Sequence, residues 1–216
     1  MKRAIIFANG KMDNPPAIVG TIQPGDLVIA ADGGSYHCKS LGLTPGVIIG
    51  DFDSLLPEEI TSYKRAGVEI IQYPSHKNET DLELALLHAV KAGANEVYIL
   101  GALGARWDMT IANIMLIAHP MFNGLKIRLL EGNQEFILLR GKEQVDLKGR
   151  PGDAISLIPL AGDTHGITTW GLEYPLKDET LYFGSPRGVS NRFMQDYAQI
   201  EVREGVLLCI LDFTEN

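Results

Sequence analysis

The chain has 216 residues, with 27 aspartates and glutamates against 19 lysines and arginines, which gives a formal net charge of −8. Hydrophobic residues make up 45 % and charged residues 21 %, which is ordinary for a globular protein and enough for a sizeable core in one large domain or two small ones. The acidic balance, with no basic block, argues against a nucleic-acid binder but leaves nucleotides open, because their phosphates arrive with Mg²⁺. No apolar run approaches the roughly 18–20 residues of a membrane span, so we expect no membrane partner.

The N-terminal segment and the two cysteines together predict a cytoplasmic protein. Residues 1–10 lack the long apolar region and the cleavage site of a signal peptide, and their pattern predicts a first strand. Cys38 and Cys209 form neither a metal-ligand spacing nor a disulfide framework. We expect both to be buried thiols in a reducing compartment.

Over residues 1–125, short apolar runs alternate with helical patterns. The runs are apolar on both faces, which is typical of buried parallel strands; they are Ala4–Ala8, Leu27–Ala31, Val47–Ile49, Val68–Gln72 and Val97–Leu100. Helices are predicted between them at Gly34–Leu41, Pro57–Ala66, Asp81–Ala92 and Asp108–Ala118. This alternation predicts a Rossmann-like α/β domain over residues 1–125, with a parallel sheet and right-handed crossovers.

The third of these helices has the clearest signals. Thr80 and Glu83 fit a capping box, and Gly93 ends the helix. Its expected apolar face comprises Leu82, Ala85, Leu86, Ala89 and Val90.

Helical periodicity disappears after about residue 125. The predicted strands are short and separated by glycine and proline; they are Lys126–Glu131, Gln134–Arg140, Gln144–Lys148, Ala154–Leu160, Gly166–Trp170, Thr180–Phe183, Ala198–Arg203 and Val206–Phe213. Glu204–Gly205 is typical of a hairpin turn. We therefore predict a second, all-β domain over residues 126–216, an antiparallel β-sandwich.

Polar segments follow the predicted parallel strands, where ligands bind in an open α/β sheet. They are Asn9-Gly10, Asp32-Gly33-Gly34, Gly50–Ser54, Lys77–Asp81 and Gly101–Asp108. Their coincidence on one edge of the sheet predicts a binding site there.

Asp51 and Asp53 are two residues apart, so on an extended segment their carboxylates point the same way. Two such anions favour a cation, and oxygen ligands of this kind suit Mg²⁺. The alternative is a turn or a helix cap, since Asp53 or Ser54 could cap the helix that begins near Pro57. Asp81 is expected on the same edge, although it could simply complement a helix dipole.

The segment Gly101–Asp108 is predicted to be a loop that leads into a helix. Its glycines allow close approach to phosphate, and Arg106 could clamp phosphoryl oxygens. The pattern is neither a Walker A motif nor the dinucleotide fingerprint. Lys77 could meet a phosphate or be an ordinary loop lysine, and Thr80 and Asp108 could be only helix caps.

Taken together, the motifs resemble the bacterial thiamine pyrophosphokinase (thiamine diphosphokinase) family over nearly the whole chain. The segments ADGG, GDFDS, T-D and G-x-x-G-x-R-x-D stand in the family's order. The second half adds the family-like segments Ser156–Leu160, Gly171–Leu176 and Ser185–Asn191. GDFDS together with R-G-x-S-N is quite specific, whereas each shorter piece is not.

The resemblance implies a kinase that transfers diphosphate from ATP to the hydroxyl of thiamine, giving AMP and thiamine diphosphate. It implies a homodimer with active sites between subunits, and Mg²⁺ held by Asp51, Asp53 and Asp81, with Arg106 as a further catalytic residue. The expected ATP-binding residues are Asn9, Asp32, Gly33, Gly34, Lys77, Thr80, Gly104, Arg106 and Asp108. The expected thiamine-binding residues are Arg187, Gly188, Ser190 and Asn191.

The chain departs from the family's pattern at Gly46, Asn78, Ala105 and Met109. Asn78 replaces an aspartate and could weaken metal binding, and Met109 replaces a histidine and removes a possible hydrogen bond. These departures leave two alternatives open. One is a pyrophosphokinase for another heterocyclic alcohol, such as a pterin, and the other is a sensor that binds thiamine or a nucleotide without turnover.

Overall fold

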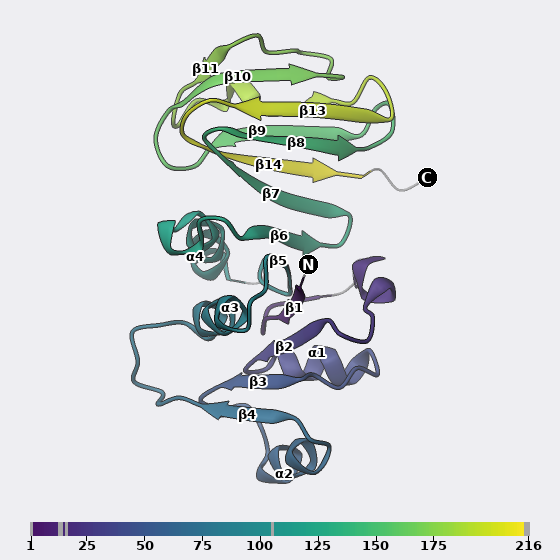
Figure 1. The fold of residues 1–216 in the computed structure, drawn as a ribbon, viewed down its shortest axis with the longest axis vertical. Coiled ribbons are helices and arrows are strands. Elements are labelled where there is room, and N and C mark those ends of the chain that lie inside the picture. The colour runs from purple at the N-terminus through teal and green to yellow at the C-terminus, as the bar shows by residue number, and fades with distance from the viewer. Residues whose placement is uncertain (1, 13–14, 16, 105, 214–216) are drawn as a thin grey trace. The chain divides into compact units, whose positions relative to one another are not determined.

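The computed structural model describes residues 2–12, 15, 17–104 and 106–213 (Figure 1). The chain divides into two compact units, Met1–Gly132 and Asn133–Asn216. No helix in the described part of the chain is long and apolar enough to cross a membrane.

Unit 1 is built on a parallel sheet with the strand order β6-β5-β1-β2-β3-β4. The strands are β1 (Arg3–Phe7), β2 (Leu27–Ala31), β3 (Val47–Gly50), β4 (Glu69–Gln72), β5 (Glu96–Leu100) and β6 (Lys126–Glu131). The predicted strands are confirmed to within about a residue at their ends. Because β1 lies between β2 and β5, the strand order reverses at β1, which is the usual place for a ligand in such a sheet.

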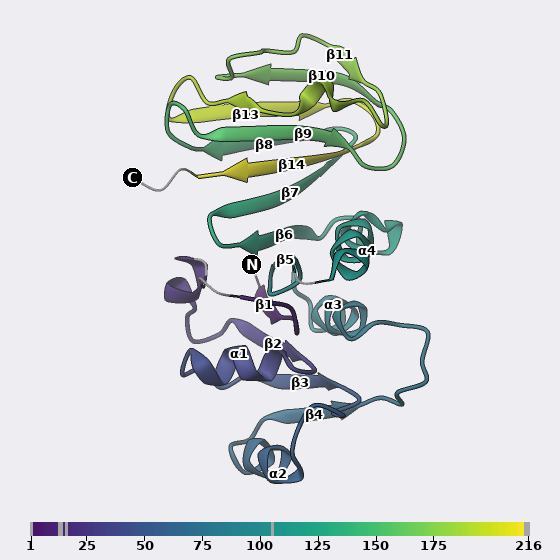
Figure 2. The ribbon, with the colours of Figure 1, turned by 180° about the vertical axis from the view of Figure 1, so that it is seen from behind.

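Helices cover both faces of this sheet, with α1 (Gly34–Ser40) on the opposite side from α3 (Asp81–Lys91) and α4 (Trp107–Ala118) (Figures 1 and 2). The fourth helix is α2 (Pro57–Arg65), and two short 3₁₀ helices lie at Ala17–Thr21 and Pro120–Phe122. Thr80 caps α3 as predicted, since its hydroxyl accepts a hydrogen bond from the backbone N–H of Glu83 (3.2 Å). The buried face of α3 includes Leu84, whereas Val90, expected there, is 42 % exposed.

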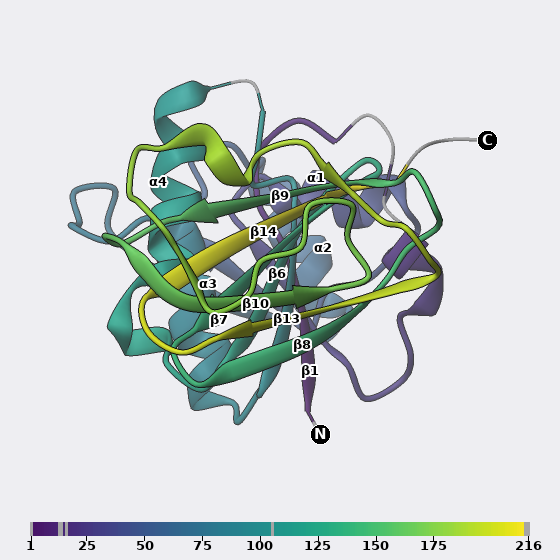
Figure 3. The ribbon, with the colours of Figure 1, turned by 90° about the horizontal axis from the view of Figure 1, so that it is seen from above.

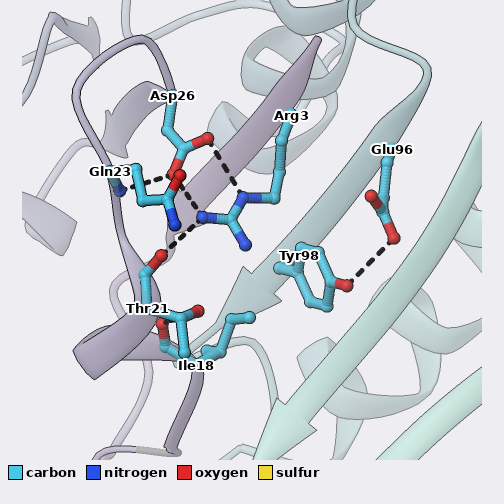
Figure 4. Close-up of polar contacts among 7 residues, drawn as sticks. All are labelled: Arg3, Ile18, Thr21, Gln23, Asp26, Glu96 and Tyr98. Carbon is cyan, nitrogen blue, oxygen red and sulfur yellow. Dashed lines mark hydrogen bonds and ion pairs between the residues drawn. The ribbon is translucent and has the colours of Figure 1, made fainter. Parts of the chain in front are cut away.

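At the amino end of β1, away from the carboxyl ends of the parallel strands, Arg3 forms a cluster of polar contacts that stabilises the sheet (Figure 4). Arg3 donates to both carboxylate oxygens of Asp26 and to the carbonyl of Thr21 (2.7 Å). Its guanidinium carbon lies 6.0 Å from the centre of the Tyr98 ring. These contacts join the start of β1 to β5 and to the segment before β2.

Unit 2 is all-β, with two sets of antiparallel strands, β12-β9-β14-β7 and β11-β10-β13-β8 (Figure 3). The strands are β7 (Gln134–Arg140), β8 (Glu143–Lys148), β9 (Ala154–Pro159), β10 (Thr164–Trp170), β11 (Glu179–Leu181), β12 (Asn191–Arg192), β13 (Tyr197–Val202) and β14 (Val206–Asp212). A 3₁₀ helix, η3, spans Pro186–Gly188. Buried side chains from both sets, such as Leu157 and Leu207 from one and Ile167 and Ile200 from the other, form one core. The predicted α/β and β-sandwich fold is thus confirmed.

Two local predictions are wrong. Strand β6, expected to begin the antiparallel part, pairs in parallel with β5 and belongs to unit 1. Its sequence, KIRLLE, has three charged and three apolar residues, so composition did not mark it as a strand of the parallel sheet. Glu204–Gly205 does not close a hairpin, because β13 pairs with β8 and β10 while β14 pairs with β7 and β9. The turn instead carries the chain from one set of strands to the other.

Candidate active site

Three carboxylates gather beyond the carboxyl ends of β2 and β3. Asp32, Asp51 and Asp53 each place a carboxylate oxygen within 4.8 Å of the other two. Asp32 is buried, Asp51 half-buried and Asp53 exposed. One oxygen of Asp32, Oδ1, is buried without a hydrogen-bond partner. Three anions this close repel one another, and a cation bound among them would remove that cost.

The local backbone holds these carboxylates in place. Asp32 (φ 45°) and Phe52 (φ 64°) both adopt the left-handed conformation, which is unusual for residues with side chains. The Phe52 ring is buried in the core, so it anchors the segment between Asp51 and Asp53. Such strain is typical of functional segments and indicates that this one is shaped for its ligands.

Hydrogen bonds add to this placement. Ser54 Oγ donates to Asp32 Oδ2 (2.9 Å), and Asn9 Nδ2 donates to the same oxygen (3.4 Å). The N-cap of α2 is Leu56, so neither Asp53 nor Ser54 caps that helix. The helix-cap alternative for the D-x-D pattern is therefore wrong, whereas the turn alternative holds in part, because Asp53 and Ser54 lie in a turn and the N–H of Asp53 donates to Asp51 Oδ1 (3.3 Å).

Asp51 is held in its ionised form. The backbone N–H of Asp53 donates to Asp51 Oδ1 (3.3 Å) and, with the Ser75 hydroxyl and the positive charge of Lys77, holds the pKa of the Asp51 carboxyl below its usual range. Partial desolvation opposes this effect without overcoming it. A carboxylate that stays charged at neutral pH is ready to bind a cation.

Asp81, the third predicted metal ligand, lies outside this group of three acids among the described residues. Its Oδ1 is 3.0 Å from Lys77 Nζ, and both side chains are largely buried. The contact is an ion pair, and this oxygen of Asp81 is buried without a hydrogen-bond partner. The sequence could not show this pairing, because residues four apart pair in this way only once the turn before α3 has formed.

A cavity of about 440 Å³ adjoins these groups at the reversal of strand order. Its walls come from the segments after β1, β2 and β5 and from the N-terminal parts of α3 and α4. Six predicted ATP-binding residues line it, namely Asn9, Asp32, Lys77, Thr80, Gly104 and Arg106. Gly33, Gly34 and Asp108 do not belong to its lining.

Gly34 has a packing role instead, and Gly10 has one in addition to lining the cavity. A Cβ on Gly34 would lie 1.9 Å from the carbonyl oxygen of Phe7, and one on Gly10 would lie 2.3 Å from that of Gly101. Both contacts are impossible, so these glycines allow α1 and the segments after β1 and β5 to approach one another at the cavity.

Arg106 and Asp108 form a two-point ion pair at the cavity mouth. Arg106 Nε donates to Asp108 Oδ1 (3.2 Å) and an η nitrogen donates to Oδ2 (2.6 Å). The pair is exposed, and the carboxylate raises the pKa of Arg106 while the guanidinium lowers the pKa of Asp108. Exposed pairs are weak, so a phosphate could take Arg106 from Asp108 at little cost.

Unit 2 contains a second cavity, of about 390 Å³. It is lined by Leu157, Glu173, Tyr174, Pro175, Leu176, Arg187, Gly188, Val189 and Asn191. Three of the four predicted thiamine-binding residues therefore line one cavity. The fourth, Ser190, is not part of the lining; it lies next to it at φ 63°, and its N–H donates to Ser156 Oγ (3.1 Å).

Asn191 fixes one wall of this second cavity. Its buried side-chain amide accepts from the backbone N–H of Tyr174 (3.0 Å) and donates to the carbonyl of the same residue (2.8 Å). Arg187 is paired with Glu179. Asn191 is therefore committed to the protein backbone, while Tyr174 presents its exposed ring.

Two polar residues that line the first cavity, Ser75 and Asn113, were not predicted from sequence to belong to a site. Glu79 and Val189 also line the cavities and lie within the predicted segments Lys77–Asp81 and Ser185–Asn191. Asn113 lies within an apolar helix, where a single amide gives little signal beyond its polarity. Of the departures from the family pattern, Met109 lines the first cavity, Asn78 is exposed and outside the lining, and Ala105 lies outside the described residues.

Comparison with known proteins agrees with the fold and gives one family match within each unit. Residues 21–129 match the thiamin pyrophosphokinase catalytic domain, and residues 142–207 match the thiamin pyrophosphokinase vitamin B1 binding domain. The chain is 29 % identical over 210 residues to the thiamine pyrophosphokinase of Bacillus subtilis, covering 97 % of this chain and 98 % of that one.

Solved structures agree as well. A crystal structure of thiamine pyrophosphokinase from Bacillus subtilis superposes with a TM-score of 0.87 at 27 % identity, covering 99 % of this chain and 100 % of that one. Thiamin pyrophosphokinase from Candida albicans shares the fold, with a TM-score of 0.78 at 18 % identity over 98 % of this chain and 90 % of that one. The chain thus belongs to the thiamin pyrophosphokinase family.

Proposed function

We propose that the protein transfers diphosphate from ATP to the hydroxyl of thiamine, giving AMP and thiamine diphosphate. One observation carries the assignment in particular: three converging carboxylates stand beside a cavity that also contains Lys77 and Arg106. That combination of a cation site and two basic side chains suits a polyphosphate, and family membership supplies the substrates.

Mg²⁺ fits the acidic group by its chemistry. The donors are all carboxylate oxygens, and one of the three acids, Asp32, has a buried oxygen, Oδ1, without a hydrogen-bond partner. We propose that Asp51 and Asp53 hold the metal, with Asp32 as a neighbouring member of the group. We keep Asp81 as a proposed third ligand, which could bind the metal only after its ion pair with Lys77 breaks. The metal supplies neutralisation of phosphate charge and a template for in-line displacement.

The protein's own residues position the nucleotide and stabilise charge. The proposed ATP-binding set keeps Asn9, Asp32, Lys77, Thr80, Gly104 and Arg106, with Gly33, Gly34 and Asp108 shaping the surrounding segments. The thiamine oxygen forms a bond to the β-phosphorus as the bond from that phosphorus to the α,β-bridging oxygen breaks. AMP leaves with that oxygen, and the proton of the thiamine hydroxyl is released to solvent. Lys77 and Arg106 stabilise the charge that develops on the phosphoryl oxygens.

Thiamine is proposed to bind in the cavity of unit 2. Support comes from Arg187, Gly188 and Asn191 in its lining, with Ser190 adjacent, and from the match of this region to the vitamin B1 binding domain. Tyr174 adds an exposed aromatic ring at the wall, and thiamine is an aromatic cation.

We also propose a cytoplasmic homodimer with active sites between subunits. Large exposed apolar side chains on unit 2, including Tyr182, Phe183 and Met194, are typical of an interface. Cys38 and Cys209 are free and buried, as expected of a protein from a reducing compartment. Light scattering of the purified protein tests the dimer directly.

The activity is tested by incubating the protein with ATP, Mg²⁺ and thiamine and measuring AMP and thiamine diphosphate. Formation of both products in equal amounts is the expected result, and their absence across a range of conditions would overturn the assignment. Replacing thiamine with a hydroxymethyl pterin tests the first alternative, a pyrophosphokinase that acts on another heterocyclic alcohol. Tight binding of thiamine without any product identifies the second, a sensor.

A further inference from the structure

Helix α4 buries two polar side chains and exposes several large apolar ones. Its buried residues are Ile117 and the polar Thr110 and Asn113, whereas Trp107, Ile111 and Met115 are 79 %, 56 % and 58 % exposed. Burying an amide and a hydroxyl is costly unless both are hydrogen-bonded. Their partners therefore show what this face of the helix is for.

Both side chains bond to carbonyl groups of the loop that precedes the helix. Asn113 Nδ2 donates to the carbonyl of Ala102 (2.7 Å). Thr110 Oγ1 has two acceptors within reach for its single proton, the carbonyl of Gly104 (3.3 Å) and that of Arg106 (3.0 Å). The second of these is an ordinary contact within a helix, so Asn113 provides the stronger link.

Two further carbonyl contacts lie in the same loop. The carbonyl of Gly101 accepts from the backbone N–H of Gly10 (2.7 Å), and that of Gly104 also accepts from the backbone N–H of Arg106 (2.7 Å). Gly101, Ala102, Gly104 and Arg106 line the cavity, as does Asn113 itself. The carbonyls at 101, 102, 104 and 106 are thus all bonded to protein groups.

The chemistry of an anion site explains this arrangement. A carbonyl oxygen that faced a phosphate would repel it, whereas N–H groups and the N-terminus of a helix attract it. We propose that Asn113, assisted by Thr110, is a positioning residue that keeps the loop carbonyls engaged, so that the loop accepts the polyphosphate of ATP. This proposal rests on the proposed function, because it names the ligand of the same cavity.

Isosteric replacements test the proposal. Asn113→Asp keeps the shape of the side chain but cannot donate to Ala102 when ionised, and Thr110→Val removes the hydroxyl while Thr110→Ser retains it. We expect Asn113→Asp to lower kcat/KM for ATP by up to ~100-fold, the scale of a misplaced binding loop. We expect Thr110→Val to raise KM for ATP by up to ~10-fold, the scale of one lost hydrogen bond, and Thr110→Ser to restore it.

The matched control is Ile111→Val, a change of one methylene group on the exposed side of the same helix. A purely structural role would affect both substrates alike, so the decisive readout is a rise in KM for ATP with KM for thiamine unchanged. Faster amide exchange of residues 101–104 and 106 in the variants would support the loop as the affected element. If Asn113→Asp fails to fold, the Thr110→Val and Thr110→Ser pair decides the outcome.

Wild-type KM for ATP in folded Asn113→Asp and Thr110→Val variants would overturn the proposal, and so would equal losses for ATP and thiamine. Binding of ATP with Mg²⁺, measured by calorimetry, distinguishes failure of the positioning role of Asn113 from failure of the proposed function. If the wild-type protein forms no thiamine diphosphate but the variants still bind ATP more weakly, the positioning role stands and the assigned reaction falls. If the variants bind ATP as the wild type does, the positioning role falls whatever the reaction is.

Discussion

The Nζ atom of Lys77 lies 3.0 Å from Oδ1 of Asp81, across the turn that begins α3. The same lysine is close enough to Asp51 for its charge to favour the ionised carboxylate. Lys77 thus interacts both with the group of three acids and with the one predicted ligand outside it. A phosphate that binds Lys77 would compete directly with Asp81.

Replacing Lys77 with methionine should reveal two effects of its charge, one on the phosphoryl group and one on the pKa of Asp51. We expect Lys77→Met to lower kcat/KM by about 100-fold, because a preorganised cation facing the transferred phosphoryl group is lost. The acid limb of the pH profile should move to higher pH, since the positive charge that helps to hold down the pKa of Asp51 is gone. An acid limb that stays where it is in the wild type would rule out this coupling.

The acidic group itself is tested by single amide replacements. Asp51→Asn and Asp53→Asn should each reduce turnover by at least ~100-fold and increase the Mg²⁺ concentration required, because a metal ligand is removed. The folded state should stay intact or gain stability, since repulsion among the three carboxylates falls. The measurements are AMP formation against Mg²⁺ concentration and the thermal midpoint, and wild-type rates in both variants would contradict the metal role.

Stability against acid should depend on the pair formed by Arg3 and Asp26. The hydrogen bonds from Arg3 hold the pKa of Asp26 below its ordinary value, so the pair stabilises the fold above pH ~4 and that contribution is lost as the pH falls through the lowered value. Asp26→Asn should therefore cost about 1 kcal/mol at pH 7 and less near pH 3.

Urea unfolding at several pH values measures this difference. The matched control is Asp178→Asn, which breaks the exposed pair with Arg203. We expect that change to stay within about 0.5 kcal/mol, as is usual for exposed pairs. A cost for Asp26→Asn that does not change with pH would show that the carboxylate charge plays no part.

The link between Asn191 and Tyr174 should control the thiamine cavity. Asn191→Ala leaves both backbone groups of Tyr174 without their side-chain partner, which should cost about 1–3 kcal/mol of stability and raise KM for thiamine. KM for ATP serves as the internal control, because its proposed site is in unit 1. A folded variant with unchanged KM for thiamine would show that the cavity wall is held in another way.

The sequence predicted the strands and helices of unit 1 well because each has a strong local cause. Thr80 caps α3, and runs such as Leu27–Ala31 are apolar throughout because both faces are buried. The partner of β6 and the crossing at Glu204–Gly205 were missed because pairing depends on residues distant in the chain. Local apolar content does not encode which strand lies alongside.

The candidate site shows the same division. The types of its residues and their order along the chain could be predicted from the sequence, and Asp51 and Asp53 do lie together as their spacing indicates. The choice of Asp32 rather than Asp81 as their near neighbour depends on the Ser54 contact and on the position of Lys77. Both are tertiary contacts that no local pattern records.

The backbone conformation of Phe52 affects which substitutions at this position would stabilise the protein and which would keep it active. Its left-handed backbone would be easier for glycine, yet glycine lacks the ring with which Phe52 anchors the acidic segment in the core. A glycine there would relax the backbone while freeing two negative charges to move apart. Phe52 therefore accepts backbone strain and in return keeps the carboxylates of Asp51 and Asp53 in fixed positions. Substitutions at this position that are selected for stability alone, without an activity screen, would tend to remove the strain and the activity together.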